Sequence, residues 1–227
     1  LVIHCAITVD NYHVLTDPYL DIQTSCVGTI ALLEACKVSR PRLIYVSTFF
    51  VYGNAPQLPV DESSPCTPRA LYPATKLCAE YFCLLYHRLY GLPVMICRLS
   101  NVYGPGEAMD NKKKGALNYL IWKAMQGEKL EIYNGGDFFR DYLYIEDVVR
   151  AILTVVYRAG NGELYLIGSG EPVRFKDVID CLHRLTGRRS LIRSFQVPDF
   201  HTVVGITNFS MSITKMQALG WAPTVTL

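Results

Sequence analysis

The sequence predicts an α/β fold built on a parallel sheet. Short runs of β-branched residues alternate with longer segments of helical periodicity, which is the pattern of strand–helix–strand crossover units. Helix signals support the same division, because Asp17-Pro18 can begin a helix while Gly91 and Gly187 can end one. We therefore expect helices packed on the faces of one parallel sheet.

The first half of the chain supplies three strands and two helices. Apolar residues from Ile22 to Ala35 recur at near-helical spacing, which predicts a helix that packs on the sheet. A loop rich in proline and serine, ending at Tyr72, precedes the second helix. In order, the expected elements are a strand at Leu1–His4, a helix at Asp17–Lys37, a strand at Arg42–Ser47, a helix at about Pro73–Tyr90 and a strand at Pro93–Leu99.

The second half continues the alternation with shorter elements. A glycine- and proline-containing loop is expected at Ser100–Gly106. After it we expect a helix at Leu117–Met125, a strand at Leu130–Tyr133, a strand–helix pair at Asp141–Tyr157, a strand at Gly162–Gly168 and a helix at Phe175–Leu185.

Composition excludes several classes of protein. The 227 residues are 50% hydrophobic and 19% charged, as in ordinary globular domains. A formal net charge of +2 gives no reason to expect nucleic acid or a membrane surface as a partner. No apolar stretch is free enough of polar residues to span a bilayer, and no signal segment opens the chain, so a cytoplasmic location is expected.

Cysteine and histidine usage points away from metal chemistry. The eight cysteines include no C-x-x-C pair, and most lie in apolar runs, as expected of buried thiols in a reducing compartment. The five histidines show no ligand spacing. We expect no metal site.

The expected sheet has no glycine-rich turn after its opening strand. The first glycine is Gly28, within a predicted helix, whereas dinucleotide-binding folds place glycines between the first strand and helix. The chain also opens on Leu1, inside a strand. We expect that two strand–helix units, roughly 60 residues, precede this chain in the full-length protein.

Tyr72 and Lys76 form the first candidate catalytic pair. A spacing of four places both side chains on one helix face, and Pro73 sets the tyrosine near the positive end of the helix dipole. A nearby ammonium favours the phenolate, so we expect Lys76 to lower the pKa of Tyr72. Alone, such a pair is more often plain helix surface.

Two neighbouring motifs strengthen this pair. Val46-Ser-Thr-Phe-Phe-Val-Tyr-Gly53 and Arg98-Leu-Ser-Asn-Val-Tyr-Gly-Pro-Gly106 both lie at carboxyl ends of predicted parallel strands, where α/β proteins bind ligands. Together with Tyr72 and Lys76 they resemble the extended short-chain dehydrogenase/reductases, in particular the NAD-dependent sugar-nucleotide epimerase/dehydratase family with UDP-glucose 4-epimerase. The resemblance covers nearly the whole chain.

The resemblance implies a fold and a division into domains. It implies a Rossmann-type, doubly wound parallel sheet whose first strands and glycine loop are absent here, with a smaller, interleaved α/β substrate domain. Residues 1–102 and 146–168 would form the remainder of the NAD-binding domain. Residues 103–145 and 169–227 would form the sugar-nucleotide domain.

The resemblance also assigns catalytic and cofactor residues. Tyr72 is implied as general acid/base on the sugar hydroxyl, Thr48 as a hydrogen-bonding partner of that hydroxyl, and Lys76 as the residue that holds the nicotinamide ribose. The cofactor is NAD, with NADP left open. The further cofactor-binding positions are Cys5, Ala6, Ile7, Thr24 and Ser100.

On the substrate side, the resemblance implies a nucleotide-diphosphate sugar. Asn101 and Arg140 match residues that contact the diphosphate, and a planar guanidinium suits paired phosphate oxygens. Leu117 and Tyr133 would line the base pocket, although the Tyr133 ring could equally be core. Taken alone, Arg140-Asp141 would be a surface ion pair.

The implied reaction is 4-epimerisation through a 4-keto intermediate. Dehydratases and decarboxylases of this family place an acidic residue after the Ser/Thr, where this chain has Phe49 and Phe50, which cannot transfer protons. A 4-ketoreductase would use the same Thr48, Tyr72 and Lys76 and remains the alternative. The chain alone could instead be an inactive fragment that lacks the glycine loop.

Three further expectations concern the surface. Family resemblance implies a homodimer formed through the Asp17–Lys37 helix and the helix of Tyr72 and Lys76. Lys112–Lys114 lacks interleaved aromatic residues and is expected to be a solvated loop. Glu146-Asp147 is expected to complement a helix N-terminus without a catalytic part.

Overall fold

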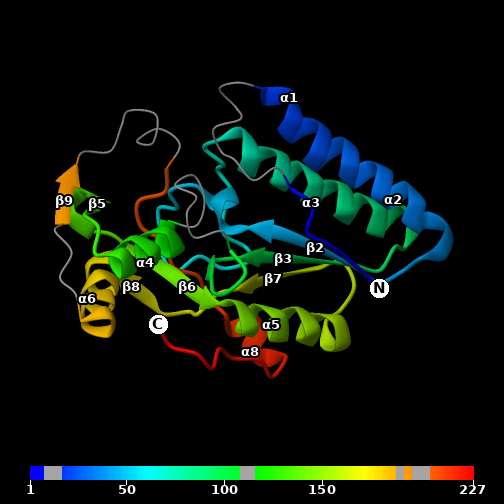
Figure 1. Ribbon diagram of the computed structural model, residues 1–227. Helices are drawn as coiled ribbons and strands as arrows, with labels where there is room; N and C mark the ends of the chain where they lie inside the picture. Colours follow the sequence, from blue (N-terminus) through cyan, green and yellow to red (C-terminus); the bar gives the residue numbers. More distant parts are fainter. Residues whose placement is uncertain (8–16, 108–115, 188–191, 196–204) are drawn as a thin grey trace.

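A computed structural model describes residues 1–7, 17–107, 116–187, 192–195 and 205–227 (Figure 1). Its central element is a four-stranded sheet in the order β1-β2-β3-β7, with every neighbouring pair parallel. The strands are β1 (Val2–His4), β2 (Leu43–Thr48), β3 (Val94–Leu99) and β7 (Glu163–Ile167). The predicted α/β fold with a parallel sheet is confirmed.

Helices cover both faces of this sheet (Figure 1). On one face lie α1 (Pro18–Asp21), the π-helical η2 (Ile22–Val27), α2 (Gly28–Ser39) and α3 (Leu71–Tyr90); on the other lie α5 (Ile145–Arg158) and α8 (Thr214–Ala218). Strand side chains alternate between the two layers. Leu43 and Tyr45 of β2 pack with residues of α2 and α3, while Ile44, between them, packs with residues of α5 and α8.

A second group of short elements adjoins one end of the sheet, at the left of Figure 1. Its strands form a three-stranded sheet, β4-β6-β8, and a parallel pair, β5 with β9. Helices α4 and α6 pack against this group through a separate apolar cluster. The bounds are β4 (Asn101–Tyr103), α4 (Ala116–Gln126), β5 (Leu130–Tyr133), β6 (Phe139–Tyr144), β8 (Pro172–Arg174), α6 (Phe175–Thr186) and β9 (Ile192–Phe195).

The structure corrects three sequence predictions. The loop expected at Ser100–Gly106 contains β4, because Asn101–Tyr103 pairs in parallel with Tyr142–Tyr144 of β6. The sequence also missed β8, β9 and α8, which are at most five residues long. The single helix expected at Asp17–Lys37 is continuous, but its middle part, η2, is wound as a π-helix.

Four further observations bear on the chemistry of the chain. The eight cysteines are all free thiols. Within the described residues, no group of three or more His, Cys, Asp or Glu side chains could hold a metal ion. In the same part of the chain, no helix combines the length and apolar character needed to cross a membrane. The lysines Lys112–Lys114 lie outside the described residues.

Candidate functional site

Thr48 ends strand β2 and begins the next turn. Its backbone is extended (φ −139°, ψ 149°), and its side-chain oxygen accepts a hydrogen bond from the Phe50 amide at 3.3 Å. That bond caps the short 3₁₀ helix η3 (Phe49–Tyr52). The cap fixes the buried Thr48 hydroxyl at the carboxyl end of the sheet.

Tyr72 lies in the first turn of α3 and meets Thr48. Burial raises the pKa of Tyr72 to about 12, and the Thr48 side chain lies close enough to act on the Tyr72 phenol and oppose part of that rise. The structure therefore brings these two predicted residues together. At neutral pH the Tyr72 phenol is protonated and ready to donate.

Lys76 lies one helical turn further along α3 and is buried. Its ammonium donates a hydrogen bond to the Val46 carbonyl at 2.6 Å and lies 4.3 Å from the centre of the Tyr45 ring. Burial lowers the pKa of Lys76 to about 8. The prediction that Lys76 lowers the Tyr72 pKa is wrong, because burial dominates that phenol and the ammonium faces Val46 and Tyr45 instead.

Three of the five further predicted cofactor residues follow the end of β1, and the other two lie on η2 and directly after β3. Cys5 and Ala6 are exposed directly after the strand, and Ile7 is half-buried. The charge of Lys76 acts on the thiol of Cys5, which places these two residues near each other. The remaining two are the half-buried Thr24 in η2 and the buried Ser100 directly after β3.

Arg140, on β6, is held by main-chain carbonyl groups. It donates to the Phe139 carbonyl at 3.1 Å and to the carbonyls of Ile206 and Thr207, and it lies 4.8 Å from the centre of the Phe138 ring. Burial lowers its pKa to about 10. Among the described residues Arg140 forms no ion pair, so its charge lacks an anionic partner there.

The alternative of a surface ion pair between Arg140 and Asp141 is wrong. The Asp141 carboxylate is fully buried and accepts hydrogen bonds from the Ser169 amide at 2.7 Å and the Gly170 amide at 3.1 Å. Successive residues of a strand point to opposite faces, so Asp141 faces the β7–β8 turn while Arg140 faces away. The half-buried Asn101 donates to the Asp141 main-chain carbonyl at 3.1 Å, which ties β4 to β6 near Arg140.

The two residues expected at the base pocket lie in the second group of elements. Leu117 of α4 is buried in an apolar cluster with Leu120 and Phe175. Tyr133 ends β5 and is half-buried opposite Phe195. Their contact with a nucleotide base stays a prediction.

Comparison with known proteins shows the family of the chain. A family model, described as the NAD dependent epimerase/dehydratase family, matches residues 1–168. The chain belongs to the NAD-dependent epimerase/dehydratase family. The predicted family is thereby confirmed, and with it the enzyme class at this level.

The relatives of this family member are named for more than one activity. A Methanocaldococcus jannaschii protein named "Putative UDP-glucose 4-epimerase" is 30% identical over all of this chain and 73% of its own length. The dTDP-glucose 4,6-dehydratase 1 of Escherichia coli is 31% identical over 92% of this chain and 64% of its own length. The chain spans only 29% of a trifunctional Arabidopsis thaliana dehydratase/epimerase/reductase.

Solved structures of the family share the fold. The UDP-glucose 4-epimerase of Thermotoga maritima, determined with UDP-glucose, superposes with a TM-score of 0.91 at 27% identity, covering 99% of this chain and 72% of that one. The UDP-glucose 4-epimerase of Thermus thermophilus, determined with NAD, gives a TM-score of 0.88 at 25% identity, with 99% and 73% covered. Both confirm the Rossmann-like architecture.

The sequence of this family member did not lead us to predict a buried ion pair. Glu80 and Arg98 form an ion pair with 2.7 Å between Oε2 and Nη2, in contact with Ser47, the residue before Thr48. A signal was present. Arg98 is a charged residue within a buried apolar strand, and such a residue requires a partner.

Asp147 has a wider role than expected. It lies in the first turn of α5, as predicted, but its carboxylate also accepts hydrogen bonds from the amides of Thr224 and Val225, each at 3.0 Å. Burial opposes ionisation, yet these bonds and the contact with Arg150 lower the pKa of Asp147 to about 2. Asp147 thus fastens the C-terminal segment to α5.

Proposed function

We propose that the full-length protein containing this chain is an NAD-dependent epimerase that inverts carbon 4 of a nucleotide-diphosphate hexose through a 4-keto intermediate. One observation carries the proposal. The hydroxyls of Thr48 and Tyr72 lie close together, one helical turn from the buried Lys76, and the adjoining Phe49 and Phe50 offer no further group able to transfer a proton.

The residues at this end of the sheet fit the nicotinamide end of a dinucleotide. Exposed Cys5 and Ala6 leave room for a ligand after β1, and the Lys76 ammonium lies within electrostatic reach of Cys5. Tyr72 and Lys76 would hold the nicotinamide ribose, with Ile7, Thr24 and Ser100 as further contacts. These residues would hold NAD, which when bound would supply reversible hydride transfer at the sugar carbon.

Tyr72 and Thr48 supply the proton transfers in this proposal. The sugar hydroxyl would lie where the two side-chain oxygens meet. Tyr72 would take the hydroxyl proton as the phenolate while hydride leaves, and the resulting phenol would return that proton at the end, so the ligand-free phenol must first release its own proton to solvent. Because burial raises the pKa of Tyr72 to about 12, its phenolate would be a strong base toward the sugar hydroxyl, and the phenol formed in that step would protonate the ketone oxygen as hydride returns. The Thr48 hydroxyl would stabilise the phenolate before hydride leaves and after it returns, and Lys76 lies one helical turn further along α3.

Packing around Phe49 speaks against dehydration. The Phe49 side chain is 3% exposed, with ring-centre distances of 4.5 Å to Phe209 and 4.3 Å to Phe50. This apolar cluster offers no acid or base at the carbon next to the ketone. The chain is similar to proteins named as dehydratases, but at Phe49 and Phe50 it lacks the acidic side chain that dehydration requires.

The charge of Arg140 supports an anionic substrate. Its guanidinium is fixed by carbonyl groups, its pKa is lowered by burial, and a diphosphate would supply the missing negative charge. Asn101, tied to the neighbouring strand, adds an amide on the same side of the molecule. We assign the diphosphate to these two residues and the base to Leu117 and Tyr133.

We also propose a homodimer formed through α2 and α3. Three large apolar residues at helical spacing on α3, Tyr81, Leu85 and Leu89, are 59%, 46% and 69% exposed. A Leu85→Glu variant should be monomeric in light scattering where the parent is dimeric. A parent that is monomeric at micromolar concentration would contradict this part of the proposal.

Product analysis tests the function. Full-length protein is incubated with UDP-glucose, UDP-N-acetylglucosamine or dTDP-glucose without added cofactor, and the products are identified by NMR. The expected result is the 4-epimer of one substrate. Stoichiometric consumption of NADPH by a 4-keto sugar would replace the proposal with the ketoreductase, and a 4-keto-6-deoxy product would replace it with the dehydratase.

The chain by itself needs a separate measurement. Equilibrium dialysis of residues 1–227 against NAD distinguishes a binding-competent chain from an inactive fragment. Tight binding would rule out the inactive fragment.

A further inference from the structure

A buried ion pair adjoins the Thr48–Tyr72–Lys76 cluster. Arg98 Nη2 lies 2.7 Å from Glu80 Oε2, and Arg98 Nε lies 3.0 and 3.2 Å from the two carboxylate oxygens. The two side chains are 6% and 3% exposed, and the guanidinium lies 4.8 Å from the centre of the Tyr52 ring. Each charge therefore depends on the other for its solvation.

The Glu80 carboxylate connects three elements of the site. Glu80 lies one helical turn after Lys76 on α3, Arg98 lies on β3, and Ser47 of β2 donates a side-chain hydrogen bond to the same carboxylate. Ser47 and Arg98 are direct partners in the sheet register, and Ser47 immediately precedes Thr48. One side chain thus sets the distance between the helix of Tyr72 and Lys76 and the strand of Thr48.

Stability alone is a poor reason for such an arrangement. Replacing a buried ion pair by apolar side chains of similar size is often neutral or stabilising, whereas removing one partner is costly. What a bidentate, buried pair supplies is a fixed geometry. This favours a role in placing the neighbouring side chains.

Glu80 also acts on the charge of Lys76. The groups facing Lys76 are His4 from β1 and Cys5 directly after it, Tyr45 and the Val46 carbonyl from β2, and Glu80 and Cys83 from α3. Burial lowers the Lys76 pKa to about 8, and Glu80 is the strongest influence that opposes this lowering. Without that carboxylate, Lys76 would lose its proton at a lower pH.

We propose that Glu80 is a positioning residue, which through Arg98 and Ser47 fixes Lys76 and Thr48 relative to Tyr72. This inference rests on the proposed function, since the positioned groups are those of the epimerase site. Glu80 itself is buried and acts only through its neighbours.

The test compares Glu80→Gln with the parent in the full-length protein. One readout is the pH profile of kcat; the other is the titration of the Lys76 side chain by NMR in ¹³C-lysine-labelled protein, assigned with Lys76→Arg. Both the alkaline limb of the profile and the titration midpoint should move to lower pH by about one pH unit, with kcat at pH 8 falling about tenfold. KM should change little.

A matched control is Glu163→Gln. Glu163 pairs with Lys215 at 2.6 Å near the surface, remote from Lys76, so this variant also removes a carboxylate from a lysine but should leave both readouts unchanged. If Glu80→Gln matches the parent in both the profile and the titration, the inference is wrong. If the parent has no epimerase activity, the proposed function fails, and the Lys76 titration still decides whether Glu80 controls its charge.

Two further variants guard against misfolding. Glu80→Gln leaves Arg98 buried without a counter-ion, so the double variant Glu80→Gln/Arg98→Met removes both charges and should fold. In this double variant the Lys76 titration midpoint should stay at the lower pH and kcat should stay reduced. Ser47→Ala, which leaves the ion pair intact, should lower kcat without shifting the titration; an unchanged kcat in both variants would overturn the inference.

Discussion

The two sides of the site hold their charges in different ways. Around Lys76, opposite charges are buried together, with Glu80 bound to Arg98 and acting on the lysine. Around Arg140, a single positive charge is fixed by carbonyl groups, and no carboxylate of the described residues pairs with it. The first arrangement is complete without a ligand, whereas the second gains a partner when an anion binds.

This difference suggests that the buried ion pair fixes the geometry of the reacting groups, whereas Arg140 binds the substrate. Paired charges at the carboxyl end of β2 and β3 fix where the reacting groups lie, so changes there should affect the chemical step. The unpaired charge on β6 suits recognition of a diphosphate, so changes there should affect affinity. The following predictions test that separation, from the largest expected effect to the smallest.

Removing the Tyr72 phenol should have the largest effect. Tyr72→Phe deletes the proton-transfer group while keeping the ring, so kcat for epimerisation should fall by about 10² to 10⁴ with little change in KM. Steady-state kinetics on the full-length protein measures this. The control is Tyr157→Phe on α5, where the side chain is 81% exposed, and this variant should match the parent. Equal kcat in Tyr72→Phe and parent would remove Tyr72 from the mechanism.

Removing the Arg140 charge should instead weaken binding. Arg140→Gln should raise KM for the nucleotide sugar by about 10- to 100-fold and lower kcat much less, because charge-assisted contacts to phosphate are lost. Arg174→Gln is the matched control, since Arg174 lies on the neighbouring strand β8 in an exposed pair with Asp137. Calorimetric titration with UDP measures the affinity directly. Unchanged UDP affinity in Arg140→Gln would contradict the diphosphate assignment.

The buried charge of Lys76 should lower the free energy of unfolding at neutral pH. Its pKa of about 8 in the folded chain lies below the ordinary value of 10.5, so the unfolded chain holds the proton more tightly and the charged lysine destabilises the fold at neutral pH. Lys76→Met should therefore raise the free energy of unfolding at pH 7 by up to about 3 kcal/mol. The difference from the parent should shrink as pH rises from 8 to 10.5.

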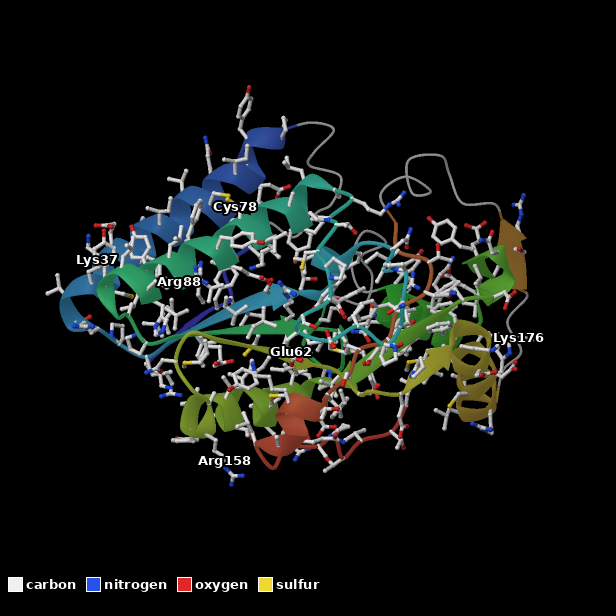
Figure 2. The ribbon with its side chains drawn as sticks, turned by 180° about the vertical axis from the view of Figure 1, so that it is seen from behind. Lys37, Glu62, Cys78, Arg88, Arg158 and Lys176 are labelled. Atoms are coloured by element: carbon white, nitrogen blue, oxygen red, sulfur yellow. The ribbon has the colours of Figure 1, made fainter. Side chains whose placement is uncertain are left out.

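The measurement is urea unfolding of both proteins across that pH range. Lys176, on α6 at the opposite end of the molecule from Lys37 (Figure 2), is exposed and provides the control. Lys176→Met should track the parent at every pH. A Lys76→Met protein less stable than the parent at pH 7 would show that the Val46 hydrogen bond and the Tyr45 contact outweigh the cost of burial.

Much of the framework could be predicted because it depends on local pattern. The alternation of apolar runs predicted β1, β2, β3 and β7. Gly91 correctly predicted the end of α3, where this glycine adopts a φ of 64°. Four-residue spacing on one helix put Tyr72 and Lys76 in the same region. The short strands β4, β8 and β9 were not found, because each contains polar residues or proline rather than a clear apolar pattern and becomes a strand through pairing with a distant segment.

The sequence by itself determined the order of the elements, the parallel sheet and membership of the epimerase/dehydratase family. Tertiary structure decided the properties of the site: that burial raises the Tyr72 pKa, that Lys76 faces Val46, that Glu80 meets Arg98 and that Arg140 turns away from Asp141. The physical reason is that periodicity follows from contacts between near neighbours in the chain. Desolvation and charge pairing depend on residues brought together from distant parts of it.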